Sequence, residues 1–231
     1  MNLLLLILAV ALGVLGAFAF PAQGKGIKYF TAFSGGFLLS ICFLELIPQS
    51  YEALGYSLGA WLLAGFFFQI VLDYFSQGAE HGHIHYHEKD EGRTPYLLLF
   101  SLCLHAFLEG MPVLNGHDHD HGNGLLFGIV VHKVPVALIL FQFLRIHKLP
   151  KARTALIMIV FAFMSPAGAL FSNWVPEIAP YLPQIRAVVL GVFLHIATTI
   201  LYESSESHRF NGLKLLAVLV GLTAGWLSIL F

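Results

Sequence analysis

Charged residues are scarce in this sequence, and cysteine is nearly absent. Asp, Glu, Lys and Arg make up only 11% of the 231 residues, whereas about a quarter of a soluble domain is charged. This scarcity excludes an ordinary water-soluble domain. Cys42 and Cys103 both lie within apolar runs, so they provide neither a disulfide framework nor a paired-cysteine zinc site. The net charge of −1 carries no information about nucleic acid, and we expect no nucleic-acid partner.

Long apolar runs dominate the chain instead. Hydrophobic residues make up 58% of the sequence, and the mean hydropathy is +0.79. Eight runs, each of roughly 18–23 residues, are long enough to cross a bilayer as helices. They lie at about 2–20, 28–49, 57–77, 95–113, 124–146, 153–172, 181–202 and 211–231. We therefore expect an all-α integral membrane protein, a bundle of eight transmembrane helices that forms a single domain over residues 1–231 within the lipid bilayer.

Basic residues are concentrated in alternate loops between these runs. Cytoplasmic loops of membrane proteins are enriched in Lys and Arg. Four alternate loops contain ten of the twelve basic residues, namely Lys25, Lys28, Lys89, Arg93, Arg145, Lys148, Lys151, Arg153, Arg209 and Lys214. We therefore expect both termini to be extracytoplasmic, the loop 78–94 to be cytoplasmic and the loop 114–123 to lie outside. A short chain with no targeting extension is typical of a bacterial inner membrane, which is the location we expect.

Four ligand-type side chains interrupt the apolar runs. His105 and Glu109 are four residues apart, so they share one face of the fourth predicted helix. His132 lies in the fifth predicted helix and Glu45 in the second. Ionisable groups at such depth are costly unless they face the bundle interior and pair. We therefore expect these four side chains to converge at mid-depth in the bundle.

Two interpretations of this cluster are open. A lone buried His or Glu usually makes a polar contact between helices, whereas four such groups, two of them on one helix face, favour a binding site. Neutral imidazole and carboxylate are ligands that suit a divalent transition metal. The pattern therefore predicts a metal site with all four side chains as ligands. Zn²⁺ is the expected ion, and the same ligands also suit Fe²⁺, Mn²⁺, Co²⁺ and Ni²⁺.

Two loops contain alternating histidines, and each lies at one predicted face of the membrane. The cytoplasmic loop contains the sequence HGHIHYHE, and the outer loop contains NGHDHDHG. Such runs are typical of flexible metal binding, and the alternative is a solvated polar loop. We predict that these histidines capture metal transiently: His81, His83, His85, His87, His117, His119 and His121.

Several motifs, in this order, resemble the signatures of the ZIP family of metal-ion transporters. HAFLEG, at 105–110, is similar to the HxxxEG signature of the family's fourth helix. HKVP, at 132–135, resembles a fifth-helix signature that contains lysine. FLELIP, which includes Glu45, resembles the second-helix motif, and GVFLHIATTILYE, at 191–203, resembles the seventh-helix pattern. The resemblance covers most of the chain, including the eight helices, the outward termini and the His-rich loop between helices three and four.

The resemblance to this family implies a function. Members take up divalent metal, most often zinc, toward the cytoplasm, through a mid-membrane site between helices four and five and without ATP hydrolysis. We therefore expect a transporter and not an enzyme, with the metal ion as its substrate. His195 stands at a position that is often aromatic in the family, and it is a candidate pathway residue. The sequence leaves open whether the transporter is a monomer or a homodimer.

The sequence departs from the family where many members bind a second metal ion. The corresponding positions here hold Ala106, Lys133 and Val136. An ammonium group cannot ligate a cation while it is protonated, and it repels a cation nearby. We predict a one-metal site in which Lys133 replaces the second ion and pairs with Glu109 or Glu45. The alternative for Lys133 is an extended side chain that reaches an aqueous edge.

Other functions fit part of this pattern. An intramembrane zinc-dependent hydrolase also uses His and acid residues within helices, but it needs an open metal position and a nucleophile. The sequence indicates no serine beside the cluster, which would leave water as the nucleophile. An efflux carrier or a metal sensor that does not transport are further alternatives, and metal flux in proteoliposomes would distinguish transport from these.

Overall fold

The chain is almost entirely helical in the computed structural model, which describes residues 2–20, 24–76, 78, 95–114, 124–203 and 212–230. No strand is found in these ranges. The α-helices are α1 (Asn2–Ala19), α2 (Lys25–Ile41), α3 (Ile47–Leu54), α4 (Leu58–Ser76), α5 (Tyr96–Gly110), α6 (Gly124–Ile146), α7 (Lys151–Trp174), α8 (Leu182–Glu203) and α9 (Gly212–Leu230). A π-helical turn, Cys42–Leu46, joins α2 to α3, and two 3₁₀ turns, Gly55–Ser57 and Pro176–Tyr181, precede α4 and α8. Every apolar run identified in the sequence therefore contains a helix.

Six helical segments of the described chain are long and apolar enough to cross a membrane. They are Asn2–Ala19, Gly26–Ser76, Gly124–Ile146, Lys151–Trp174, Pro176–Tyr202 and Gly212–Leu230. The second of them runs from α2 to α4 and turns at Gly55, whose φ of 54° lies in the left-handed region that glycine adopts readily. Helix α5 is apolar but has only 15 residues. It is shorter than the predicted run at 95–113 because Pro112 disfavours helical conformation in the residue before it.

The outer surface of the bundle is apolar, as a bilayer requires. Large hydrophobic side chains point outward from several helices, and Leu15, Phe67 and Trp226 are each more than half exposed. A surface of this kind would cause a protein to associate or aggregate in water, whereas it is in contact with lipid in a membrane. The described chain is therefore that of a multi-pass membrane protein.

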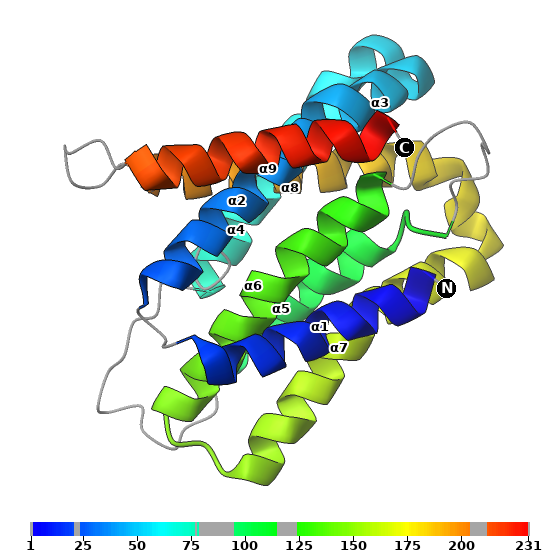
Figure 1. Cartoon of the computed structure of the whole chain (residues 1–231). Coiled ribbons are helices and arrows are strands. Elements are labelled where there is room, and N and C mark those ends of the chain that lie inside the picture. The colour runs from blue at the N-terminus through cyan, green and yellow to red at the C-terminus, as the bar shows by residue number, and fades with distance from the viewer. Residues whose placement is uncertain are drawn as a thin grey trace.

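The helices pack as two groups that meet along α2 and α6 and along α4 and α5. Helices α1, α5, α6 and α7 lie together, and α2, α4, α8 and α9 lie together (Figure 1). Between the groups, Gly128 of α6 lies against Leu38 and Ile41 of α2; a Cβ built on Gly128 would be 3.4 Å from Leu38 Cδ1. The marked N and C termini lie at the same end of the bundle (Figure 1).

Glycines allow α5 and α7 to approach each other so closely that their backbones are in contact. A Cβ atom at Gly110 of α5 would lie 2.0 Å from the carbonyl oxygen of Ser165, and one at Gly168 of α7 would lie 1.9 Å from that of Phe107. Membrane helices commonly associate through such small residues, since lipid provides no hydrophobic drive to bring them together. The close approach brings the side chain of Ser165 against α5, where the candidate site lies.

Candidate metal site

His105 and Glu109 lie on one face of α5, as their spacing predicts. Nε2 of His105 is 3.3 Å from Oε2 of Glu109. Both side chains are buried in the interior of the bundle. The apolar residues around them on α5, such as Leu102 and Ala106, belong to one hydrophobic cluster, so the two polar groups lie in an otherwise apolar environment.

His132 of α6 completes a group of two imidazoles and one carboxylate. Its ring meets that of His105 edge to face, with ring centroids 6.1 Å apart and an interplanar angle of 84°. His132 is also buried. Two neighbouring helices thus bring together three of the four side chains that the sequence identified as candidate ligands.

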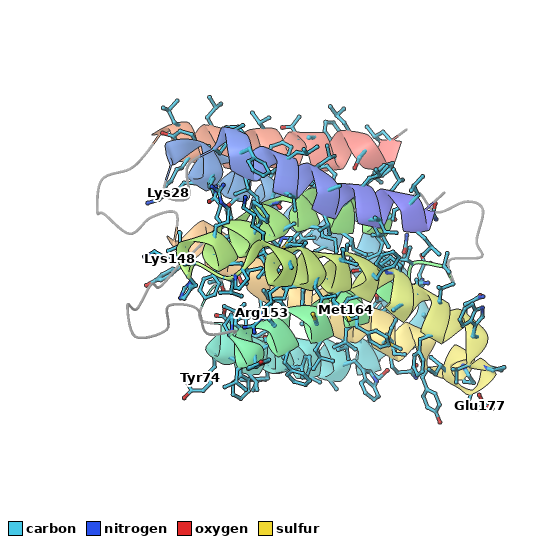
Figure 2. All side chains as sticks on the ribbon, turned by 90° about the horizontal axis from the view of Figure 1, so that it is seen from below. Lys28, Tyr74, Lys148, Arg153, Met164 and Glu177 are labelled. Atoms are coloured by element: carbon cyan, nitrogen blue, oxygen red, sulfur yellow. The ribbon has the colours of Figure 1, made fainter. Side chains whose placement is uncertain are left out.

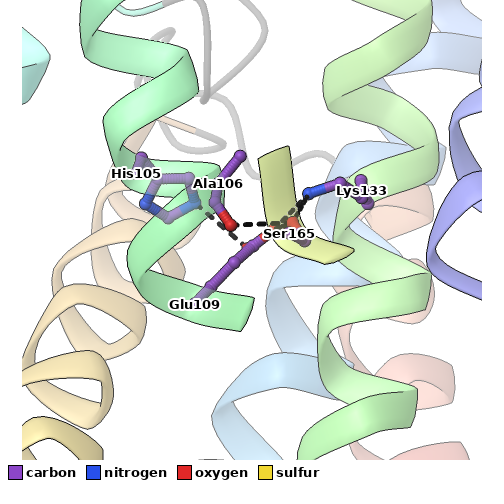
Figure 3. A network of polar contacts seen from close by, with 5 residues as sticks. All are labelled: His105, Ala106, Glu109, Lys133 and Ser165. Carbon is purple, nitrogen blue, oxygen red and sulfur yellow. Dashed lines mark hydrogen bonds and ion pairs between the residues drawn. The ribbon is translucent and has the colours of Figure 1, made fainter. Parts of the chain in front are cut away.

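Lys133 lies beside this group and forms an ion pair with Glu109. Its Nζ contacts Oε1 of Glu109 and is 2.5 Å from Oγ of Ser165 (Figure 3). It also lies 5.1 Å from the centroid of the Phe161 ring, a distance at which a cation is attracted to an aromatic face. Lys133 is only 2% exposed, so its side chain does not extend to an aqueous edge. Glu109 is one of the two acids that the sequence proposed as its partner.

Ser165 of α7 also belongs to this network of polar contacts around Glu109, and the sequence did not predict its presence there. Its hydroxyl oxygen is 2.9 Å from Oε1 of Glu109 and 2.7 Å from the carbonyl oxygen of Ala106 (Figure 3). A hydroxyl group has one proton to donate, so it bonds one of these two acceptors at a time while it accepts from Lys133. The only signal in the sequence is a polar residue before Pro166 within an apolar run.

The presence of Ser165 corrects the expectation that no serine lies beside the cluster. Its hydroxyl group is already engaged with Lys133 and with acceptors on α5. Ser165 is also fully buried. These contacts indicate a structural or positioning role for its hydroxyl group.

Glu45, in the turn between α2 and α3, lies apart from this group, beside the start of α6. A Cβ built on Gly124 would lie 1.5 Å from Oε2 of Glu45, and Gln49 donates a hydrogen bond of 3.4 Å to Oε1. His132 is eight residues further along α6, a rise of about 12 Å. Glu45 belongs to the π-helical turn, a feature that is frequent at functional sites and that the sequence did not reveal.

The full set of four ligands therefore stays a prediction. In the described part of the chain, no group of three or more His, Cys, Asp or Glu side chains is arranged closely enough to hold a metal ion. His105, Glu109 and His132 are neighbours. Glu45 lies near the first residue of α6, before His132 in that helix. Closer convergence would require α2 and α6 to shift relative to each other.

The other candidate residues lie apart from this group. Nε2 of His195 on α8 is 3.9 Å from Oδ2 of Asp73 on α4, and its ring meets that of Phe66 at a centroid distance of 5.0 Å. Its assignment to a pathway stays a prediction. The histidines of both loops lie outside the described residues, namely His81, His83, His85, His87, His117, His119 and His121.

The fold and the buried group define a class of protein, a multi-pass membrane protein whose apolar bundle encloses imidazole and carboxylate groups. Comparison with known sequences gives the family. The chain belongs to the ZIP family, since the family model described as ZIP Zinc transporter matches residues 76–229. That match includes α5, α6 and α7, and therefore every residue of the network around Glu109.

Individual relatives agree with this assignment. The chain is 27% identical over 249 residues to the zinc transporter ZIP1 of Homo sapiens. The aligned region covers 87% of this chain and 77% of the relative. The chain is 24% identical over 255 residues to the zinc transporter ZupT of Chlorobium luteolum, covering 99% of this chain and 96% of the relative. An uncharacterized protein of Methanocaldococcus jannaschii is 26% identical over 202 residues.

Proposed function

We propose that this protein transports divalent metal ions, zinc in particular, across a membrane toward the cytoplasm. The observation that carries the proposal is the buried group of His105, Glu109 and His132, contributed by two helices of an apolar bundle. Buried ionisable groups of this kind mark ion pathways in membrane proteins. Membership of the ZIP family and the relatives named zinc transporters support zinc as the ion.

We infer eight membrane crossings with both termini outside. The crossings are α1, the continuous segment from α2 to α3, α4, α5, α6, α7, α8 and α9. Lys28 and Lys148 lie at one end of the bundle and Glu177 at the other, and both termini lie at the end of Glu177 (Figures 1 and 2). Because basic residues favour the cytoplasmic side, the end with Lys28 and Lys148 would be cytoplasmic. A bacterial inner membrane suits this orientation.

Metal ligation would use one imidazole from each of α5 and α6 together with Glu109, and Glu45 would join as the helices shift. Neutral imidazole and carboxylate suit Zn²⁺. Oε2 of Glu109 faces His105, whereas Oε1 is engaged by Lys133 and Ser165. A metal ion could therefore use one carboxylate oxygen without displacing the lysine. Alternate exposure of this site to the two sides would move the ion without ATP hydrolysis.

Lys133 would replace a second metal ion and weaken the hold on the first. It neutralises the charge of Glu109 at close range, so less negative charge is available to bind a divalent cation. Transport needs release as much as capture, and a moderate affinity serves both. The histidine loops at the two faces would capture metal transiently before entry and after release.

Zinc flux into proteoliposomes that contain only this protein tests the proposal. The wild type should carry zinc down its gradient, whereas His105→Ala and Glu109→Ala should each abolish flux when normalised to folded protein. His147→Ala is a matched control, because His147 is a buried histidine at the end of α6 outside the proposed site. No zinc flux in the wild type would refute transport, and near-normal flux in either site variant would remove that residue from the essential site.

A further inference from the structure

Two buried hydroxyl groups of α2 have no role in the site described so far. Ser34 is 0% exposed and Thr31 is 5% exposed. Within the described ranges, neither hydroxyl oxygen has a hydrogen-bond partner. Buried serine and threonine in helices commonly bond to a carbonyl of the preceding turn, and leaving a polar group unpaired in an apolar interior is unfavourable. Two unpaired hydroxyl groups one turn apart therefore call for an explanation.

The helical period and two flanking contacts place both hydroxyl groups toward α6, near the level of His132 and Pro135. Positions 27, 31, 34, 38 and 41 share one face of an α-helix with 3.6 residues per turn. On that face, Ile27 packs in a cluster with Leu138 and Ile139 of α6, and Leu38 and Ile41 lie against Gly128 of α6. Thr31 and Ser34 lie between these two contacts, so they point to the segment of α6 between 128 and 138.

The interface between α2 and α6 differs in chemistry on the two sides of His132. Toward the end with Glu45, it is closed by Leu38 and Ile41, both fully buried. In the other direction, it contains the hydroxyl groups of Thr31 and Ser34. Pro135 has no amide proton to donate to the carbonyl group of Val131, so a further oxygen atom is freed at this level of α6.

We propose that Thr31 and Ser34 form a second binding position for the divalent cation, on the route from His132 to the cytoplasm between α2 and α6. Hydroxyl and carbonyl oxygens have lone pairs for a cation and carry no charge, so they would hold the ion loosely after the imidazoles release it. This inference rests on the proposed function for the identity and direction of the ion. Helix α2 would thus take part in the release of the ion, a role that no sequence motif indicates.

The first test removes the hydroxyl groups with little change in shape. The double variant Thr31→Val with Ser34→Ala should lower zinc flux roughly tenfold, the effect of losing a charge-assisted interaction from the transition state for release. Zinc affinity at equilibrium, measured on purified protein, should be unchanged. The double variant Thr31→Ser with Ser34→Thr keeps both hydroxyl groups and should retain flux. Ser40→Ala is the control, because Ser40 is buried on another face of α2 against Gly225.

Wild-type flux in the variant without hydroxyl groups would overturn the proposal. An equal loss of flux in the variant that keeps both hydroxyl groups would also overturn it, because packing rather than oxygen chemistry would then be responsible. Retained flux with the hydroxyl groups and lost flux without them supports the proposal, provided that Ser40→Ala transports normally.

A second test does not depend on transport. In a background with Cys42→Ala and Cys103→Ala, Ser34→Cys should react with a charged thiol reagent applied from the cytoplasmic side, and zinc should slow this reaction. Ser40→Cys should not react. Absence of labelling at Ser34→Cys would overturn the proposal. If the wild type carried no zinc but Ser34→Cys were labelled and protected by zinc, the proposed function would fail and the cation position would stand.

Discussion

At the scale of single residues, Glu109 divides its two carboxylate oxygens between different partners. Oε2 lies 3.3 Å from His105, and Oε1 is held by Lys133 and Ser165. Breaking a buried ion pair by removing one partner typically costs about 3–5 kcal/mol, because the remaining charge is left uncompensated. Lys133 therefore orients Glu109 and also limits the negative charge at the site.

Replacing Lys133 by an acid tests whether it substitutes for a second ion. Lys133→Glu removes the repelling ammonium and adds a carboxylate beside Glu109, so the site should bind two zinc ions where the wild type binds one. Without metal, the adjacent carboxylates repel, and the variant should unfold at a lower temperature than the wild type. Added zinc should restore much of that loss, since an ion that binds only the folded state stabilises it. Native mass spectrometry gives the ion count.

Lys133→Met is the matched control for this count, since it removes the charge and supplies no ligand. It should still bind a single ion. Two ions at the membrane site of the wild type would contradict the idea that lysine replaces one of them. One ion in both Lys133→Glu and the wild type would show that the charge of Lys133 does not determine the number of ions bound.

At the scale of elements, the contact between α5 and α7 sets the position of the network. Gly110 and Gly168 let the two backbones approach closely enough for Ser165 to bond with the carbonyl of Ala106. A side chain at either glycine would push α7 away and lengthen the hydrogen bonds of Ser165. The geometry around Glu109 thus depends on two residues that contain no polar side chain.

Gly168→Ala tests this dependence. Its Cβ would lie 1.9 Å from the carbonyl oxygen of Phe107, so the helices must separate, at a cost of about 1–3 kcal/mol for overpacking. The variant should unfold in detergent at a lower temperature and carry zinc more slowly. Gly59→Ala is the control, because nothing lies within 4 Å of the Cβ there. It should be as stable as the wild type or slightly more stable. Equal melting temperatures for both variants and the wild type would show that the α5–α7 contact tolerates separation.

At the scale of the whole molecule, the bundle consists of two helix groups joined along α2 and α6 and along α4 and α5 (Figure 1). The group of His105, Glu109 and His132 belongs to one of them, and Glu45 and the hydroxyl groups of α2 belong to the other. Metal passing between the groups would meet side chains of both in turn. A shift of one group against the other would change which of them lie together.

The histidine loops belong to none of the apolar runs of the sequence, so we expect them to affect the supply of metal rather than its passage. Changing His81, His83, His85 and His87 together to Ser should leave maximal zinc flux intact and alter its dependence on zinc concentration. Flux measured over a range of zinc concentrations in proteoliposomes provides the check. Complete loss of flux in a variant that reaches the membrane in folded form would make this loop an obligatory part of the path.

The sequence by itself determined the helical membrane class and the pairing within α5. Apolar runs of spanning length have to form helices, because a bilayer offers no other partner for backbone groups. The spacing of His105 and Glu109 then places them on one face, since a helix has 3.6 residues per turn. The motif residues around them were sufficient to indicate the family, and the match over residues 76–229 confirms it.

Only the tertiary structure decided which helices meet and at what level. Ser165 joins Glu109 because glycines bring α7 against α5, and no local pattern in α7 specifies that contact. Glu45 lies beside Gly124 rather than next to His132, because the register between α2 and α6 and the π-helical turn set its height. Contacts between helices depend on the packing of residues far apart in the chain, whereas the period of a helix acts within a few residues.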